Sequence, residues 1–355
     1  MELFKCQNCG QVLFFENRLC GRCGHRLGFM AKQAELSALE PDGAEWHAMA
    51  APGSNWRFCA NAEYDACNWL IPSGSADRFC TACRHNRMVP DLSVEANLVG
   101  WRKMEQAKHR LFYTLILLHL PTPNRVDEPK AGLVFDVLAD PPGPEGNKVL
   151  TGHEEGVITL ALAEADDPER ELRRAEMGEP YRTLLGHFRH EIGHFYWNLL
   201  VRDEGRLDAC RAVFGDDRED YGEALKRHYA EGPPPDWQDN YVSAYATTHA
   251  WEDFAETWAH YLHTVDSLET AAAFGIEVHP TIAGDPLLHA ETKVDPYQAG
   301  SFDRLAGTWV PLTIALNAMN RSMGHGDLYP FVLAPSVIRK LSFIHDLVHA
   351  PRRRR

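Results

Sequence analysis

Residues 186–197 contain two histidines and a glutamate at a spacing that can bind and activate a metal ion. Positions 190–194 read His-Glu-Ile-Gly-His, the H-E-x-x-H spacing typical of zinc hydrolases. The flanks are apolar and lack proline between 181 and 201, which favours a buried helix. Because residues four apart share a helix face, His190 and His194 can direct ring nitrogens at one ion. Glu191 then lies about 100° round the helix, where it can act as a base on zinc-bound water.

Two further residues of this helix bear on the interpretation. His187 shares the face of His190 and His194 and is a competing ligand. We favour His190 and His194, because this choice gives the neighbouring Glu191 a role. Gly193 costs a helix about 1 kcal/mol relative to alanine, which indicates that another element packs closely against this turn.

A second apolar segment, residues 241–263, can supply the third ligand. We expect a helix from Trp251 to Thr264 with Thr248 as its N-cap. Glu252 and Glu256 are four apart on this helix, and two carboxylates facing a core are costly unless a cation or hydrogen-bond donors compensate them.

We therefore predict Glu252 as the third zinc ligand. Glu256 is expected to accept a hydrogen bond from the second ring nitrogen of His190 or His194. The alternative is a solvated acidic stripe, which the surrounding apolar residues disfavour; these include Phe254, Ala255, Trp258, Ala259 and Leu262.

Eight of the nine cysteines precede residue 84, and without a visible export signal they are expected to bind metal rather than form disulfides. Two C-x-x-C pairs within residues 1–30 are typical of a structural zinc ribbon; they are Cys6, Cys9, Cys20 and Cys23. A second structural zinc module is predicted over residues 56–92. Its ligands are Cys59, Cys67, Cys80 and Cys83, with His85 open as a replacement for one cysteine.

Composition narrows the class of protein. The chain has 355 residues, 36 basic and 50 acidic, and a net charge of −14, so we expect no general attraction to nucleic acid. No run of 18 apolar residues and no signal peptide are visible, so we expect a cytoplasmic protein without a membrane span. Residues 351–355 form a basic tail with four arginines at 352–355, and we expect a solvated end rather than a site for an acidic partner.

The remaining segments are expected to form a scaffold. Residues 31–55 resemble a linker, and residues 93–350 form the main domain. Within that domain we expect a first helix over 94–120 and surface helices over 203–229. Strands are expected at 133–138, 149–153 and 156–162, and late helices at 312–323 and 335–349, with 271–311 mostly loop.

The two helical motifs together resemble a known class of enzyme. H-E-x-x-H followed on a later helix by E-x-x-A-E resembles the gluzincin metallopeptidases. Tyr245, seven residues before Glu252, resembles the tyrosine that polarises the scissile carbonyl in the lethal-factor-like branch. The N-terminal ribbon combined with Ser-Ala-Tyr-Ala at 243–246 and the motif at 251–263 is similar to the bacterial zinc-binding metallopeptidases with an N-terminal zinc ribbon.

This resemblance implies an α+β fold, with a mainly α gluzincin-type domain and a short β-sheet after the zinc modules. It implies one catalytic zinc besides two structural ones, and hydrolysis of a peptide or protein substrate by water that Glu191 activates. Tyr245, or failing it His249, would stabilise the developing oxyanion. An extended substrate would pair with the edge strand formed near 149–153, and the ribbon would offer a surface for a protein partner.

Two other interpretations stay open at this point. One is an inert scaffold protein that uses its zinc ribbons for interaction. The other is a zinc hydrolase of a non-peptide amide.

Overall fold

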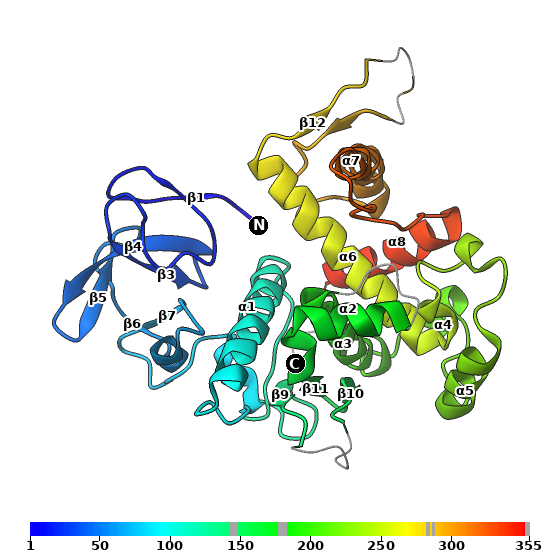
Figure 1. Ribbon diagram of the computed structural model, residues 1–355, viewed down its shortest axis with the longest axis horizontal. Helices are drawn as coiled ribbons and strands as arrows, with labels where there is room; N and C mark the ends of the chain where they lie inside the picture. Colours follow the sequence, from blue (N-terminus) through cyan, green and yellow to red (C-terminus); the bar gives the residue numbers. More distant parts are fainter. Residues whose placement is uncertain (142–147, 177–182, 282–284, 286–287, 352–355) are drawn as a thin grey trace. The chain divides into compact units, whose positions relative to one another are not determined.

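The computed structural model describes residues 1–141, 148–176, 183–281, 285 and 288–351 (Figure 1). The chain forms two compact units, residues 1–172 and 173–355. Helices and strands are both well represented, so the predicted α+β class is confirmed. The basic tail, residues 352–355, lies outside the described part of the chain. No helix in the described ranges has both the length and the apolar character needed to cross a membrane.

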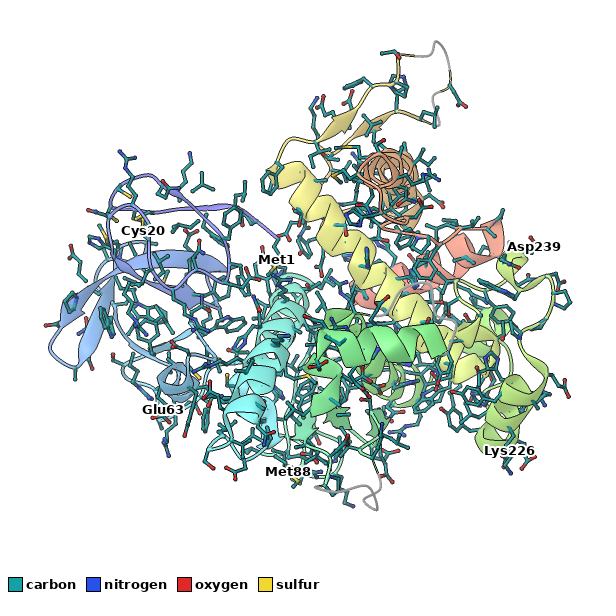
Figure 2. All side chains as sticks on the ribbon, viewed as in Figure 1. Met1, Cys20, Glu63, Met88, Lys226 and Asp239 are labelled. Carbon is teal, nitrogen blue, oxygen red and sulfur yellow. The ribbon has the colours of Figure 1, made fainter. Side chains whose placement is uncertain are left out.

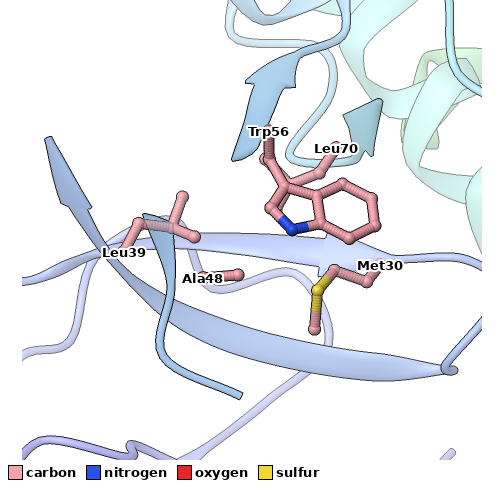
Figure 3. Packing of buried hydrophobic residues seen from close by; sticks show 5 residues of the cluster. All are labelled: Met30, Leu39, Ala48, Trp56 and Leu70. Carbon is pink, nitrogen blue, oxygen red and sulfur yellow. The ribbon is translucent and has the colours of Figure 1, made fainter. Parts of the chain in front are cut away.

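The first unit begins with a small hairpin and a five-stranded antiparallel sheet. Strands β1 (Phe4–Lys5) and β2 (Val12–Leu13) form the hairpin that carries Cys6 and Cys9. Cys20, labelled in Figure 2, and Cys23 follow it in the chain. The sheet follows in the order β3 (Arg26–Met30), β4 (Glu35–Asp42), β5 (Glu45–Ala48), β6 (Asn55–Phe58) and β7 (Leu70–Pro72). One face buries a cluster of side chains (Figure 3), which are Met30, Leu39, Ala48, Trp56 and Leu70.

The expected linker over residues 31–55 is wrong, because this segment contains β4 and β5. The Ala/Glu-rich composition of this segment gave no sign of a strand. Leu36, Ala38 and Leu39 become buried only because β3 and β5 pair with β4. Ala34 and Gly43 adopt positive φ, at 51° and 59°, and thereby form the tight turns at either end of β4. The zinc modules are therefore joined by one continuous sheet.

The first unit also contains a long helix and a mixed sheet. Helix α1 (Glu95–Leu117) buries Trp101, Leu111 and Phe112. The sheet has the order β10 (Gly152–Glu154), β11 (Val157–Ala161), β9 (Val134–Leu138) and β8 (Asn86–Met88). Positive φ at Glu155 and Gly156, 42° and 85°, closes the β10–β11 hairpin with a turn that suits twisted strands. The predicted edge strand is therefore present as β10, although its pairing with substrate stays a prediction.

The second unit is organised around one long helix, α6 (Ala250–Ala273), drawn in yellow in Figure 1. It contacts α3 (Leu184–Tyr196), α4 (Leu207–Phe214), α7 (Phe302–Ser322) and α8 (Pro335–His349). The second unit also contains a π-helical turn (Trp197–Arg202), α5 (Tyr221–Glu231), β12 (Glu277–Val278), β13 (Ala290–Glu291) and 3-10 turns at Trp237–Asp239 and Tyr245–Thr247.

The first unit also contains 3-10 turns at Ala60–Tyr64, Cys83–His85 and Leu162–Ala165. Helix α2 (Asp167–Glu176) spans the division between the units.

Two helices are longer than their sequences indicated. Helix α6 begins after His249 rather than Thr248 and continues to Ala273. Helix α7 begins at Phe302, inside the segment expected to be loop, and runs through Pro311. A proline removes one backbone hydrogen bond from a helix. Here the buried side chains of Leu305, Trp309 and Leu312 outweigh that loss by packing within the unit.

Helices α3 and α6 pack closely together at Gly193. A Cβ atom added there would lie 3.0 Å from Ala255 Cα and 3.1 Å from Trp258 Cβ. The nearest of these atoms belongs to the backbone of α6 and cannot rotate away. The close packing expected from this glycine is therefore present.

We expect Gly193→Ala to destabilise the protein by up to about 2 kcal/mol in urea unfolding. Overpacking typically costs about 1–3 kcal/mol, against a gain of about 1 kcal/mol in helix propensity. Gly307→Ala in α7 is the matched control, because nothing lies within 4 Å of its added Cβ. The control should be stabilised by up to about 1 kcal/mol. Equal stabilisation of both variants would contradict the packing argument.

Candidate active site

The second unit brings the three predicted zinc ligands together. One donor atom from each of His190, His194 and Glu252 lies within 4.8 Å of the others. Glu252 Oε2 is 3.0 Å from His190 Nε2 and 3.5 Å from His194 Nε2. Ligands placed tetrahedrally about 2.0–2.1 Å from a zinc ion lie about 3.3 Å apart, so this donor set fits zinc. His187 does not belong to this group of donors.

The charges at this centre suit a bound cation. Glu252 is only 2% exposed, and burial alone would raise its pKa. The facing imidazoles nevertheless hold the pKa of Glu252 well below its usual value. Burial likewise opposes a charge on His190, but Glu252 and Glu256 hold its pKa well above the usual value. Two ionised carboxylates are thus held beside two imidazoles, and a divalent ion would compensate them.

Glu256 holds the ring of the first histidine. His190 Nδ1 donates to Glu256 Oε1 at 2.7 Å, so a metal ion that replaced the Nε2 proton would meet the Nε2 lone pair. Burial raises the pKa of Glu256, but the hydrogen bond and charge of His190, the charge of His260 and the Ser243 hydroxyl lower it to about 2. Ser243 donates to Glu256 Oε2 at 2.6 Å and accepts from the Ala246 amide at 3.1 Å. Ser243 therefore links the carboxylate to the turn that carries Tyr245.

Tyr221 is a site residue that the sequence did not reveal. Its hydroxyl donates to Glu252 Oε1 at 2.9 Å from the first position of α5. The segment was expected to be surface helix, and Tyr221 is indeed 39% exposed, so its local pattern carries no signal of this contact. Asp220 caps the helix by accepting from the Glu223 amide and thereby positions the tyrosine.

Tyr245 lies beside the ligand histidines. Its ring centroid is 5.9 Å from that of His190. Burial, and then the charge of Glu252, raise the pKa of Tyr245 well above its usual value, so the hydroxyl keeps its proton and can donate a hydrogen bond. The Trp251 ring lies against that of His194, with the centroids 3.7 Å apart and the ring planes tilted by 35°. The two ligand rings therefore each have an aromatic neighbour.

His249 has a different role from the one considered for it. Its Nδ1 accepts from the Trp251 amide at 3.1 Å, which caps α6, and its Nε2 donates to the Glu219 carbonyl at 3.1 Å. With both ring nitrogens engaged, no proton is left for an oxyanion. The structure favours a capping role for His249 and leaves Tyr245 as the candidate for oxyanion stabilisation.

Glu191 has the environment of a proton acceptor. Its side chain is buried, and burial raises its pKa. Within the described residues, no hydrogen bond reaches its buried Oε2 atom. A carboxylate with a free oxygen next to the ligand histidines can exchange a proton with a bound molecule.

The cysteines of the first unit form the two predicted groups of four. The Sγ atoms are 3.6 Å apart in Cys6–Cys23 and Cys9–Cys20, and 3.8 Å apart in Cys67–Cys80. Thiolates about 2.3 Å from a tetrahedral zinc lie about 3.8 Å apart, whereas disulfide sulfurs are about 2.05 Å apart. Both groups therefore fit zinc. His85 is not one of the donors in the second group, and its Nδ1 donates to the Leu133 carbonyl.

We expect Glu256→Gln to weaken zinc binding at the histidine centre by about 10- to 100-fold, because a neutral amide holds the His190 proton less strongly. The measurement is zinc affinity by competition with a chelator. Glu223→Gln on α5 is the matched control, since its exposed carboxylate pairs with Lys226, which Figure 2 labels on α5. Equal affinities for the two variants would show that Glu256 does not support the ligand.

Comparisons with known proteins agree with this picture. A zinc-ribbon domain model matches residues 3–94, and a model described as "Putative zinc-binding metallo-peptidase" matches residues 97–347. The second match begins in α1, so it includes part of the first compact unit. Two relatives, the uncharacterized proteins Mb2598c of Mycobacterium bovis and Rv2568c of Mycobacterium tuberculosis, are each 44% identical over 349 residues, covering 98% of this chain and 95% of theirs. No solved structure matches. Since the peptidase model covers more than half of the chain, the chain belongs to the family described as "Putative zinc-binding metallo-peptidase" and carries an N-terminal zinc-ribbon domain.

Proposed function

We propose that the second unit hydrolyses peptide bonds as a gluzincin-type zinc metallopeptidase. The observation that carries this proposal is the convergence of His190, His194 and Glu252 donor atoms beside the buried Glu191. The family membership supports the same reaction class. The proposed substrate is a peptide or protein.

The chain's own residues divide the work. A zinc ion at this site would supply Lewis-acid polarisation of the scissile carbonyl and acidify water. Glu191 accepts the proton of the attacking water at its free oxygen and later passes it to the leaving amine. Its buried position favours uptake of the proton, because burial disfavours the charged carboxylate and raises the pKa of Glu191.

The two tyrosines have separate tasks in this proposal. Tyr245 keeps its proton and donates to the oxygen that gains negative charge as the carbonyl is attacked. Tyr221 donates to Glu252 Oε1 and so directs the other oxygen, Oε2, towards both imidazoles. Tyr245 thus acts on substrate, whereas Tyr221 positions a ligand.

We expect Glu191→Gln to keep zinc but to lower peptide hydrolysis by at least about 10²- to 10⁴-fold, since general-base catalysis contributes about that much. Cleavage is measured as new N-termini in a proteome-derived peptide library, and zinc by elemental analysis. Glu231→Gln at the exposed end of α5 is the control. Unchanged cleavage in Glu191→Gln would refute the assignment. Activity confined to small amides would show that the substrate is a non-peptide amide rather than a peptide.

The tyrosine pair gives a second test. Tyr245→Phe should lower kcat by about 10²- to 10³-fold with zinc affinity unchanged, because only a transition-state hydrogen bond is removed. Tyr221→Phe should weaken zinc binding, and activity should recover when zinc is added in excess. The reverse pattern would exchange the two roles.

A further inference from the structure

The second cysteine group of the first unit has a fifth donor beside it. His109 on α1 is only 4% exposed, and its Nε2 is 3.2 Å from Cys67 Sγ, 3.5 Å from Cys83 Sγ and 3.9 Å from Cys80 Sγ. Structural zinc takes four ligands, whereas four thiols, the His109 ring and, 3.4 Å from Cys83 Sγ, the Glu105 carboxylate lie together here. They cannot all be ligands in a single tetrahedral arrangement.

The orientation of His109 suits a metal ligand. Its Nδ1 donates to the Glu105 carbonyl at 2.6 Å, one turn earlier in the same helix. In a neutral imidazole this places the lone pair on Nε2, the atom that faces the sulfurs. Ligand histidines in proteins almost always hold their second nitrogen in this way.

The distances also fit a set of three sulfurs and one nitrogen. With Zn–S about 2.3 Å and Zn–N about 2.0–2.1 Å, a tetrahedral site has S···N separations of about 3.5 Å and S···S separations of about 3.8 Å. The three distances from His109 Nε2 to sulfur, 3.2, 3.5 and 3.9 Å, lie around the expected S···N separation of about 3.5 Å. The Cys67–Cys80 distance of 3.8 Å matches the expected S···S separation. Cys59 Sγ lies within 4.8 Å of the same three sulfurs. Cys67, Cys80 and Cys83 are thus common to two possible sets.

We propose that Cys59 and His109 are alternative fourth ligands of one zinc site, so that the site keeps its ion when the Cys59 thiolate is removed. This inference concerns the first unit and does not depend on peptidase activity. It assigns α1 a direct bond to the metal when His109 is the ligand. By contrast, the group of donors at the first ribbon consists of four cysteines only, among the residues that the structure describes.

The test measures zinc per chain in the full-length protein after exposure to a weak chelator. Cys59→Ser and His109→Gln should each retain the wild-type zinc content, whereas the double variant should lose one equivalent. Cys6→Ser is the matched control, because it removes a buried thiol from the ribbon without a fifth donor and should lose one equivalent alone. Loss of zinc from Cys59→Ser, or retention of zinc by the double variant, would overturn the proposal.

A direct spectroscopic readout covers the case in which the double variant fails to fold. Cys59→Ser is loaded with ¹¹³Cd and labelled with ¹⁵N-histidine, and NMR is used to look for one-bond coupling between cadmium and His109 Nε2. The proposal requires this coupling. A bound metal without it would show that His109 only donates a hydrogen bond to the thiolates and would refute the ligand role.

Discussion

The close approach of α3 to α6 is the constraint on which the metal centre depends. Gly193 lies between the two ligand histidines, and Ala255 lies three residues after Glu252. Direct contact of these small residues sets the two helices at a separation where imidazole and carboxylate donors are about 3 Å apart. A larger residue at either position would push the two helices apart and so separate the donor atoms, although every ligand residue would still be present.

Buried ion pairs fix the rotation of the same helices. Asp253 is fully buried next to Glu252 and pairs with Lys340 of α8 at 2.6 Å, while Arg189 of α3 pairs with Asp266 of α6. Such pairs add little net stability, because desolvation opposes the Coulomb attraction, but loss of one partner leaves an uncompensated charge and is strongly destabilising. A rotation of α6 that turned Glu252 away from the histidines would also separate Asp253 from Lys340, and it is disfavoured for that reason.

Which parts of the fold and of the site can be predicted from the sequence depends on how far apart along the chain the contacting residues lie. The H-E-x-x-H residues and the Glu252–Glu256 pair were predictable, because a helix converts a spacing of four into a shared face. Tyr221 and His109 were not, since each reaches its partners from an exposed or unremarkable position on another helix through the tertiary fold. Strands β4 and β5 were missed for a related reason: their apolar residues gain burial only through pairing with neighbouring strands. Helix α7 continues through Pro311 because the burial of its apolar side chains outweighs the backbone hydrogen bond that proline removes.

The contact of Trp251 with His194 makes the centre asymmetric. The His194 side chain is 4% exposed, against 14% for His190, and the indole and imidazole centroids are 3.7 Å apart. His194 is thus better shielded from water than His190 and cannot swing out without losing this contact. An ion bound here would therefore meet bulk water first on the side of His190.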